Sequence, residues 1–196
     1  MLDQLPLPGF DTPPMQTPTD RLLLALFPET TAASQIALLA KDVAGKSALR
    51  GAPLRTERFH VTLFHLGDYF GLPQGVVDAA QEAAAALDFP AFDVAFDRVE
   101  SFYRKSGAQP LVLRGGDGLA ALRTFREALG ASMMKAGLGR SAKSSFTPHV
   151  TLLYDDQSIG AQTVEPIGWT AHEFVLVHSL LNKTQYIPLA RWPLRG

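Results

Sequence analysis

The sequence predicts a mixed α+β fold, and three observations lead to that prediction. Apolar residues make up 46% of the 196 residues, which is typical of a globular chain and not of a disordered one. Short apolar or alternating segments of strand length are interleaved with longer segments whose apolar residues recur at helical spacing. The phrase His-Val-Thr-Leu occurs twice, at 60–63 and 149–152, each time inside a strand-sized apolar run. The chain is therefore expected to combine several strands with a few helices.

The first elements are predicted as follows. Residues 1–19 contain five prolines and are expected to form an extended tail, which leaves residues 20–196 as the folded domain. The apolar run 21–27 predicts a buried strand. A Pro-Glu start at 28–29 and apolar residues on one side predict a helix that ends near Gly45. Residues 58–66 predict the strand with the first phrase, closed by Gly67.

The remaining elements alternate in the same way. The alanine-rich stretch 76–87 predicts a helix that stops at Phe89-Pro90, and 92–96 alternates as a strand does. A short strand at 111–113 precedes a helix at 119–136, which has one apolar stripe and a glycine beyond its end. Residues 148–154 predict the strand with the second phrase, and 173–181 and 185–194 predict two closing strands.

The two phrases are the candidate functional residues. In a strand, residues i and i+2 point to the same face, so each copy pairs an imidazole with a hydroxyl, His60 with Thr62 and His149 with Thr151. An imidazole can give or take a proton near neutrality, and a pair of them suits a displacement at phosphorus. Threonine hydroxyls can hold the non-bridging phosphate oxygens, and this chemistry requires neither a metal nor a cofactor.

Composition and charge limit the other possibilities. The chain has no cysteine, so disulfides and cysteine nucleophiles are excluded. The net charge of −1 argues against binding to nucleic acid by bulk electrostatics, so a nucleic-acid substrate would be a short end held locally. No apolar run approaches the roughly 20 residues that a membrane-spanning helix needs, and no secretory signal precedes the domain. A cytoplasmic monomer without membrane contact is the expectation.

Two further histidines are expected to be structural. His65 has the strand parity of Val61 and Leu63, which predicts that it turns away from His60 and packs against neighbours. His178 lies in a closing strand, where structural hydrogen bonding is favoured over a role in the site.

These motifs resemble the two-histidine (2H) phosphoesterases, and among them the bacterial RNA 2′,3′-cyclic phosphodiesterases, also called 2′-5′ RNA ligases. The resemblance covers roughly residues 20–195. It rests on the opening strand at 21–26, on the two phrases with their flanking residues at 59–67 and 146–152, and on the closing strands at 179–194.

The resemblance implies a single bilobal (LigT-like) domain at 20–196, with two antiparallel sheets around a central cleft and helices on the outside. It implies that His60 donates a proton, that His149 accepts one, and that Thr62 and Thr151 hold the phosphate. The implied reaction is metal-independent hydrolysis of 2′,3′-cyclic phosphate ends of RNA or nucleotides to 2′-phosphates, together with 2′-5′ RNA ligation.

The chain departs from the family pattern just after each motif. Family members often carry an arginine there, whereas this chain has Phe64 and Tyr154. An aromatic ring does not clamp phosphate as arginine does, but it can stack on a base, and Tyr154 and Phe146 are the candidate substrate-binding residues. Two alternatives stay open: a nucleotide- or RNA-binding module with weak or altered catalysis, and a phosphodiesterase for another small cyclic phosphate.

Overall fold

The computed structural model describes residues 17–143, 145–181 and 183–195, and its strands form one antiparallel eight-stranded sheet. The strand order is β6-β3-β4-β5-β2-β1-β7-β8. The strands are β1 (Asp20–Leu26), β2 (Val61–Tyr69), β3 (Phe92–Ser101), β4 (Gln109–Arg114), β5 (His149–Asp155), β6 (Gln162–Ala171), β7 (Glu173–Leu180) and β8 (Gln185–Pro193). The predicted α+β class is confirmed. Residues 1–16 of the predicted tail lie outside the described residues.

The sheet consists of two four-stranded halves that meet at a narrow joint. One half is β6-β3-β4-β5 and the other is β2-β1-β7-β8, and the ladder between β2 and β5 contains a single pair, Val61 with Val150. The expectation of two separate sheets is not confirmed, because backbone pairing at these two valines makes the sheet continuous. The joint lies within the two repeated phrases.

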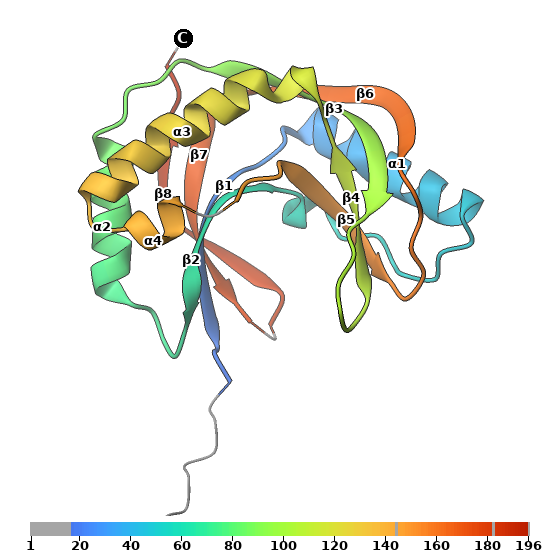
Figure 1. Cartoon of the computed structure of the whole chain (residues 1–196), viewed down its shortest axis with the longest axis horizontal. Coiled ribbons are helices and arrows are strands. Elements are labelled where there is room, and N and C mark those ends of the chain that lie inside the picture. The colour runs from blue at the N-terminus through green and yellow to red at the C-terminus, as the bar shows by residue number, and fades with distance from the viewer. Residues whose placement is uncertain (1–16, 144, 182, 196) are drawn as a thin grey trace, which may run out of the picture.

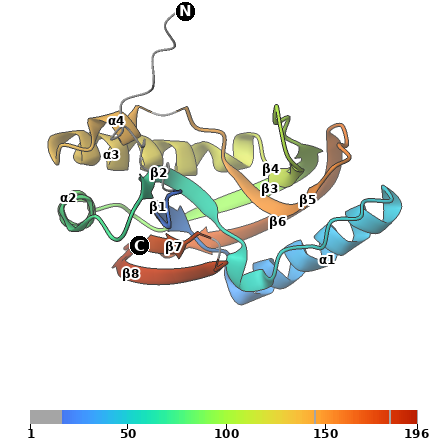
Figure 2. The same ribbon diagram turned by 90° about the horizontal axis from the view of Figure 1, so that it is seen from below.

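Within the described part of the chain, four helices cover the sheet: α1 (Thr30–Lys46), α2 (Gln74–Ala85), α3 (Ala120–Lys135) and the short α4 (Gly139–Ala142). Helix α1 contacts β5 and β6, whereas α2 and α3 pack on each other and reach β8 and β3. Figures 1 and 2 show α1 at one end of the molecule and α2 at the other, and α3 packs on both α2 and β3. A single large core joins both halves, with α3 contributing Leu122, Phe125, Leu129 and Met133.

The predicted helices and strands are present, with ends that differ by a few residues, but β6 was missed. Pro166 and Gly168 interrupt its sequence, and only Ile167, Trp169 and Ala171 have buried side chains. As the edge strand of the sheet, β6 tolerates a proline that a central strand would exclude.

Strand β2 contains two irregularities that change which face its side chains occupy. Its register against β1 runs Ala25 to Thr62 and then Leu24 to Phe64, so Leu63 is an extra residue. Leu63 and Phe64 are consequently both buried, and His65 is exposed. The prediction that His65 turns away from His60 is therefore wrong, because it assumed an unbroken alternation.

The second irregularity lies near Gly67, which does not close the strand as predicted. Leu22 pairs with Gly67 and Leu23 with His65, and β2 continues to Tyr69. Gly67 has a φ of +141°, and a Cβ there would lie 2.6 Å from the Tyr69 hydroxyl, so glycine is required at this position.

Candidate functional site

The joint of the sheet brings the two repeated phrases side by side. Extending the antiparallel register through Val61 and Val150 places His60 opposite Thr151 and Thr62 opposite His149. Val61 and Val150 are fully buried, whereas the four polar side chains are half-buried. The alternation inferred from the sequence thus sends the valines into the core and the histidines and threonines to the other face.

These four side chains line one cleft of about 480 Å³. Tyr154 lines the same cleft, with 45% of its surface exposed. Residues from β1, the segment before β2, β2 itself and β8 complete the wall, including Arg21, Arg58, His65 and Tyr186. The cleft is large enough for a nucleotide-sized ligand.

Both candidate imidazoles are oriented by the same backbone contact. The Nδ1 atom of His60 lies 2.8 Å from the Arg58 carbonyl oxygen, and Nδ1 of His149 lies 2.7 Å from the Thr147 carbonyl oxygen. A carbonyl only accepts, so each Nδ1 donates and carries the hydrogen of the neutral ring. In each case Nε2 is the nitrogen left for acid–base chemistry.

The surroundings of the two imidazoles also repeat. His60 meets the ring of Tyr186 edge-on at a centroid distance of 5.3 Å, and His149 meets Phe102 edge-on at 5.0 Å. An arginine guanidinium lies over each of these aromatic rings, Arg58 over Tyr186 and Arg114 over Phe102. The repeat therefore extends beyond the four letters of the sequence, to a histidine, an aromatic ring and an arginine in each half.

Burial disfavours the charged form of both imidazoles. It lowers the pKa of His60 from its ordinary value of 6.5 to about 4, with the nearby His149 adding a smaller effect in the same direction. Burial also lowers the pKa of His149, and Arg114 adds to that shift. Both imidazoles are therefore neutral at pH 7 in the free protein. An anion in the cleft would raise both pKa values, because it favours the charged form.

The charges that line the cleft favour an anion. Two arginines, Arg21 and Arg58, contribute positive charge to the wall, and the imidazoles of His60, His65 and His149 line the same cleft. None of the described residues of the lining is acidic. Arg58 is held in place by two hydrogen bonds. Its Nη1 donates to the Thr184 carbonyl oxygen, and its Nη2 donates to the Tyr186 hydroxyl at 3.3 Å. The cleft thus carries positive charge although the whole chain has a net charge of −1.

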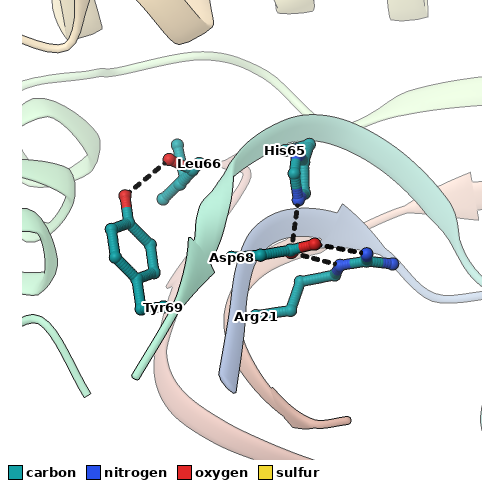
Figure 3. A network of polar contacts seen from close by, with 5 residues as sticks. All are labelled: Arg21, His65, Leu66, Asp68 and Tyr69. Atoms are coloured by element: carbon teal, nitrogen blue, oxygen red, sulfur yellow. Dashed lines mark hydrogen bonds and ion pairs between the residues drawn. The ribbon is translucent and has the colours of Figure 1, made fainter. Parts of the chain in front are cut away.

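A polar network occupies one end of the cleft (Figure 3). The Asp68 carboxylate accepts two hydrogen bonds from Arg21, from Nε at 2.7 Å and from Nη2 at 2.8 Å. The same carboxylate lies 2.9 Å from Nε2 of His65. The hydrogen bonds from Arg21 lower the pKa of Asp68 to about 2, with His65 contributing less. Asp68 is therefore ionised at neutral pH and fixes the side chains of Arg21 and His65.

The two other aromatic candidates lie outside the cleft. Phe64 is 1% exposed and packs beneath the Arg126 guanidinium, 4.3 Å from its ring. Phe146 has the same guanidinium 4.5 Å from its ring and lines a separate cavity of about 270 Å³ with Arg114 and Arg123. Of the aromatic residues that the sequence singled out, only Tyr154 faces the candidate catalytic residues.

His178 is structural, in agreement with the sequence. It is buried, and its Nε2 lies 2.5 Å from the Asp20 carboxylate, which also accepts a hydrogen bond from the Gly71 amide. These contacts fasten the start of β1 to β7 and to the end of β2.

Sequence reasoning missed Arg21, Arg58, His65 and Tyr186. Arg58 stands two residues before His60, which is a same-face position in an extended chain and therefore a usable signal. Arg21 is the one charged residue of the apolar run 21–27, and this is a second signal that the sequence contains. No sequence signal pointed to Tyr186, because it comes from a strand more than 100 residues away from His60.

The described residues contain no group of three or more histidine, cysteine, aspartate or glutamate side chains arranged to hold a metal ion. Among the same residues, no helix has both the length and the apolar composition needed to cross a bilayer.

The chain matches known proteins in sequence and in fold. The profile of the 2′-5′ RNA ligase superfamily matches residues 27–182. Apo LigT of E. coli superposes with a TM-score of 0.70 at 23% identity, covering 92% of this chain and 100% of that one. The protein TT0787 of Thermus thermophilus gives a TM-score of 0.68 at 21% identity, covering 90% and 98%.

A structure of E. coli LigT complexed with 3′-AMP also matches, with a TM-score of 0.62, 23% identity and coverage of 92% and 100%. No curated protein matches the chain with significance. The structural matches establish the shared fold, and the superfamily profile extends over most of the chain. The chain therefore belongs to the 2′-5′ RNA ligase superfamily, within the two-histidine phosphoesterases.

Proposed function

We propose that this protein is a metal-independent phosphodiesterase that opens 2′,3′-cyclic phosphate ends of RNA or nucleotides to 2′-phosphates. The observation that carries the proposal is the paired arrangement of His60 and His149, each with Nδ1 bonded to a backbone carbonyl and each beside a threonine in one cleft. Two imidazoles fixed in this way supply an acid and a base to one phosphorus centre. Membership of the superfamily supports the same chemistry.

The proposed reaction is one in-line displacement. Water attacks the phosphorus and gives its proton to Nε2 of His149, while the bond from phosphorus to the 3′ oxygen breaks. His60 gives a proton to that departing oxygen, and the product keeps a 2′-phosphate. Thr62 and Thr151 donate hydrogen bonds to the non-bridging oxygens, which stabilises charge there in the transition state. The roles of the two histidines follow the family resemblance.

His60 needs a proton that it lacks in the empty cleft at neutral pH. Binding of the substrate phosphate promotes uptake of this proton, because its negative charge next to the imidazole raises the pKa that burial had lowered. Substrate binding and protonation of His60 are therefore coupled in this proposal.

The pH dependence follows from these pKa shifts. For kcat/KM, which reports the free protein, we expect a bell whose maximum lies between about pH 4 and pH 6.5, since both pKa values lie below 6.5 before substrate binds. For kcat, the maximum is expected at a higher pH, because the bound anion raises both values. Steady-state rates on a cyclic mononucleotide across this range measure both curves. A kcat/KM maximum above pH 7 would contradict the assignment.

The activity itself is tested by incubation of the protein with 2′,3′-cyclic mononucleotides and with a short RNA that ends in a cyclic phosphate. A chelator is present throughout, and the product is identified by phosphorus NMR. We expect 2′-phosphate as the product. Turnover that vanishes with chelator, or a 3′-phosphate product, would overturn the proposed reaction.

Ligation uses the same groups in the same direction, with a different nucleophile, and is the second activity that we propose. An RNA 5′-hydroxyl replaces water, attacks the cyclic phosphate and forms a 2′-5′ linkage. If substrates bind the cleft without any turnover, the binding-module alternative is favoured over both activities.

A further inference from the structure

The cleft extends past the candidate catalytic residues to the side chains of Arg21 and His65. Both line the same cavity as His60 and Thr62, whereas Asp68, which holds them, is not among the described residues of its lining. Figure 3 shows the Asp68 carboxylate between the two side chains. The Arg21 and His65 side chains are therefore presented to the cleft, and the Asp68 carboxylate supports them from the side.

The pairing with β1 gives the position of these side chains relative to the motif. Thr62 is level with Ala25, His65 with Leu23, and Asp68 with Arg21. Each step is two residues along the strand, or about 7 Å. Moving along β1 from the threonine that would hold the reacting phosphate, the cleft thus reaches His65 first and Arg21 second. This order matches a ligand whose second anionic group lies one ribose away from the first.

We propose that Arg21 and His65 form a subsite for a second phosphate group of the substrate. The inference rests on the proposed function in taking the first phosphate to lie between His60 and His149. The substrate class is then a cyclic-phosphate end that carries a further phosphate on its 5′ side, not a cyclic nucleoside phosphate alone.

The environment of the subsite supports an anion. Arg21 keeps its charge at every relevant pH, and the contact with Asp68 raises its pKa further. Asp68 offsets the charge of Arg21, but the same lining also contains Arg58, and none of its described residues is acidic. The double hydrogen bond from Arg21 to Asp68 also fixes the guanidinium, so little side-chain freedom is lost when a phosphate binds.

The subsite also accounts for the departure from the family pattern after the motifs. Tyr154 and Phe64 stand where family members often have arginine, and Phe64 is buried in the core. A bulge at Leu63 instead turns His65 into the cleft, next to Arg21. Arg21 and His65 are thus presented to the substrate from β1 and β2, with His65 at the same sequence distance from His60 as Tyr154 is from His149.

The test compares two probes that differ by one phosphate. Adenosine 2′-phosphate and adenosine 2′,5′-bisphosphate are titrated into the full-length protein by calorimetry. We expect the bisphosphate to bind about tenfold more tightly, since a charge-assisted contact with arginine is gained. In Arg21→Gln this preference is expected to fall to nearly one, and in His65→Gln it is expected to decrease.

Matched controls separate the subsite from general loss of charge. Arg191→Gln removes another exposed strand arginine that pairs with a carboxylate, Glu173, and that lies outside the cleft, so the preference is expected to persist. His172→Gln is the corresponding histidine control. The subsite is refuted if the unaltered protein binds both probes with equal affinity. It is also refuted if the preference is unchanged in both single variants, Arg21→Gln and His65→Gln.

A third probe distinguishes the source of the second phosphate. A dinucleotide that ends in a 2′-phosphate carries its second phosphate as an internal linkage. Tight binding of this probe identifies an RNA strand as the ligand, and tight binding of the bisphosphate alone identifies a 5′-phosphorylated nucleotide. Because these titrations need no turnover, the subsite can stand even if cyclic phosphates are not hydrolysed, and the two proposals fail separately.

Discussion

Replacement of His60 or His149 by alanine is expected to lower kcat on a 2′,3′-cyclic phosphate by about 10²–10⁴-fold, the usual contribution of a positioned acid or base. Each imidazole is held by one backbone carbonyl and serves one proton transfer, so either change removes a complete step. The double variant is expected to be little slower than the worse single variant, because acid and base act as a unit. Rates are measured at saturating substrate on purified proteins.

His172→Ala is the matched control for these variants. His172 is an exposed histidine just before β7, away from the cleft, and its loss is expected to leave kcat within about twofold, as for a surface substitution. The site assignment is refuted by a His60 or His149 variant that turns over as fast as this control.

Phe64→Ala is expected to reduce the free energy of unfolding by about 3–5 kcal/mol. Phe64 is 1% exposed, it packs beneath Arg126, and it lies so close to α3 that a Cβ at Gly130 would be 3.3 Å from its ring. Removal of the ring leaves a cavity between β2 and α3 that these neighbours do not fill. Urea unfolding followed by circular dichroism measures the loss.

Tyr154→Ala is expected to give the opposite result, although Tyr154 also follows closely after one of the two motifs. Tyr154 is 45% exposed in the cleft, so its loss is expected to change stability by about 0.5 kcal/mol or less and to raise KM instead. Similar stability losses in the two variants would show that the two aromatic residues do not divide between core and cleft in this way.

Much of the fold follows from local patterns. The strands around both phrases, the three long helices and the closing strands each have a clear hydrophobic period in the sequence. The edge strand β6 does not, because its proline and glycine are tolerated only at a sheet edge, which is a property of the tertiary arrangement. The number of sheets could not be predicted from the sequence either, since it depends on whether two valines 89 residues apart pair through their backbones.

The site was predictable in part for the same reason. Same-face spacing in a strand correctly grouped each histidine with its threonine, because that rule involves only neighbours in sequence. It failed for His65, since one extra residue at Leu63 inverts the faces between it and the second irregularity near Gly67. Arg21 and Tyr186 reach the cleft from strands that lie beside β2 or beyond it, and such proximity follows from strand order rather than local pattern.

The strand order also determines when this protein becomes competent during synthesis. The half that contains His60 is built from β1 and β2 near the beginning of the chain and from β7 and β8 near its end. As the nascent polypeptide emerges, β1 has no neighbour on its other side until Glu173–Leu180 has been translated. The first histidine is made early, but the strands that complete the scaffold around it, β7 and β8, are made more than 100 residues later. The cleft therefore assembles around His60 only after synthesis has passed through the segment that carries His149.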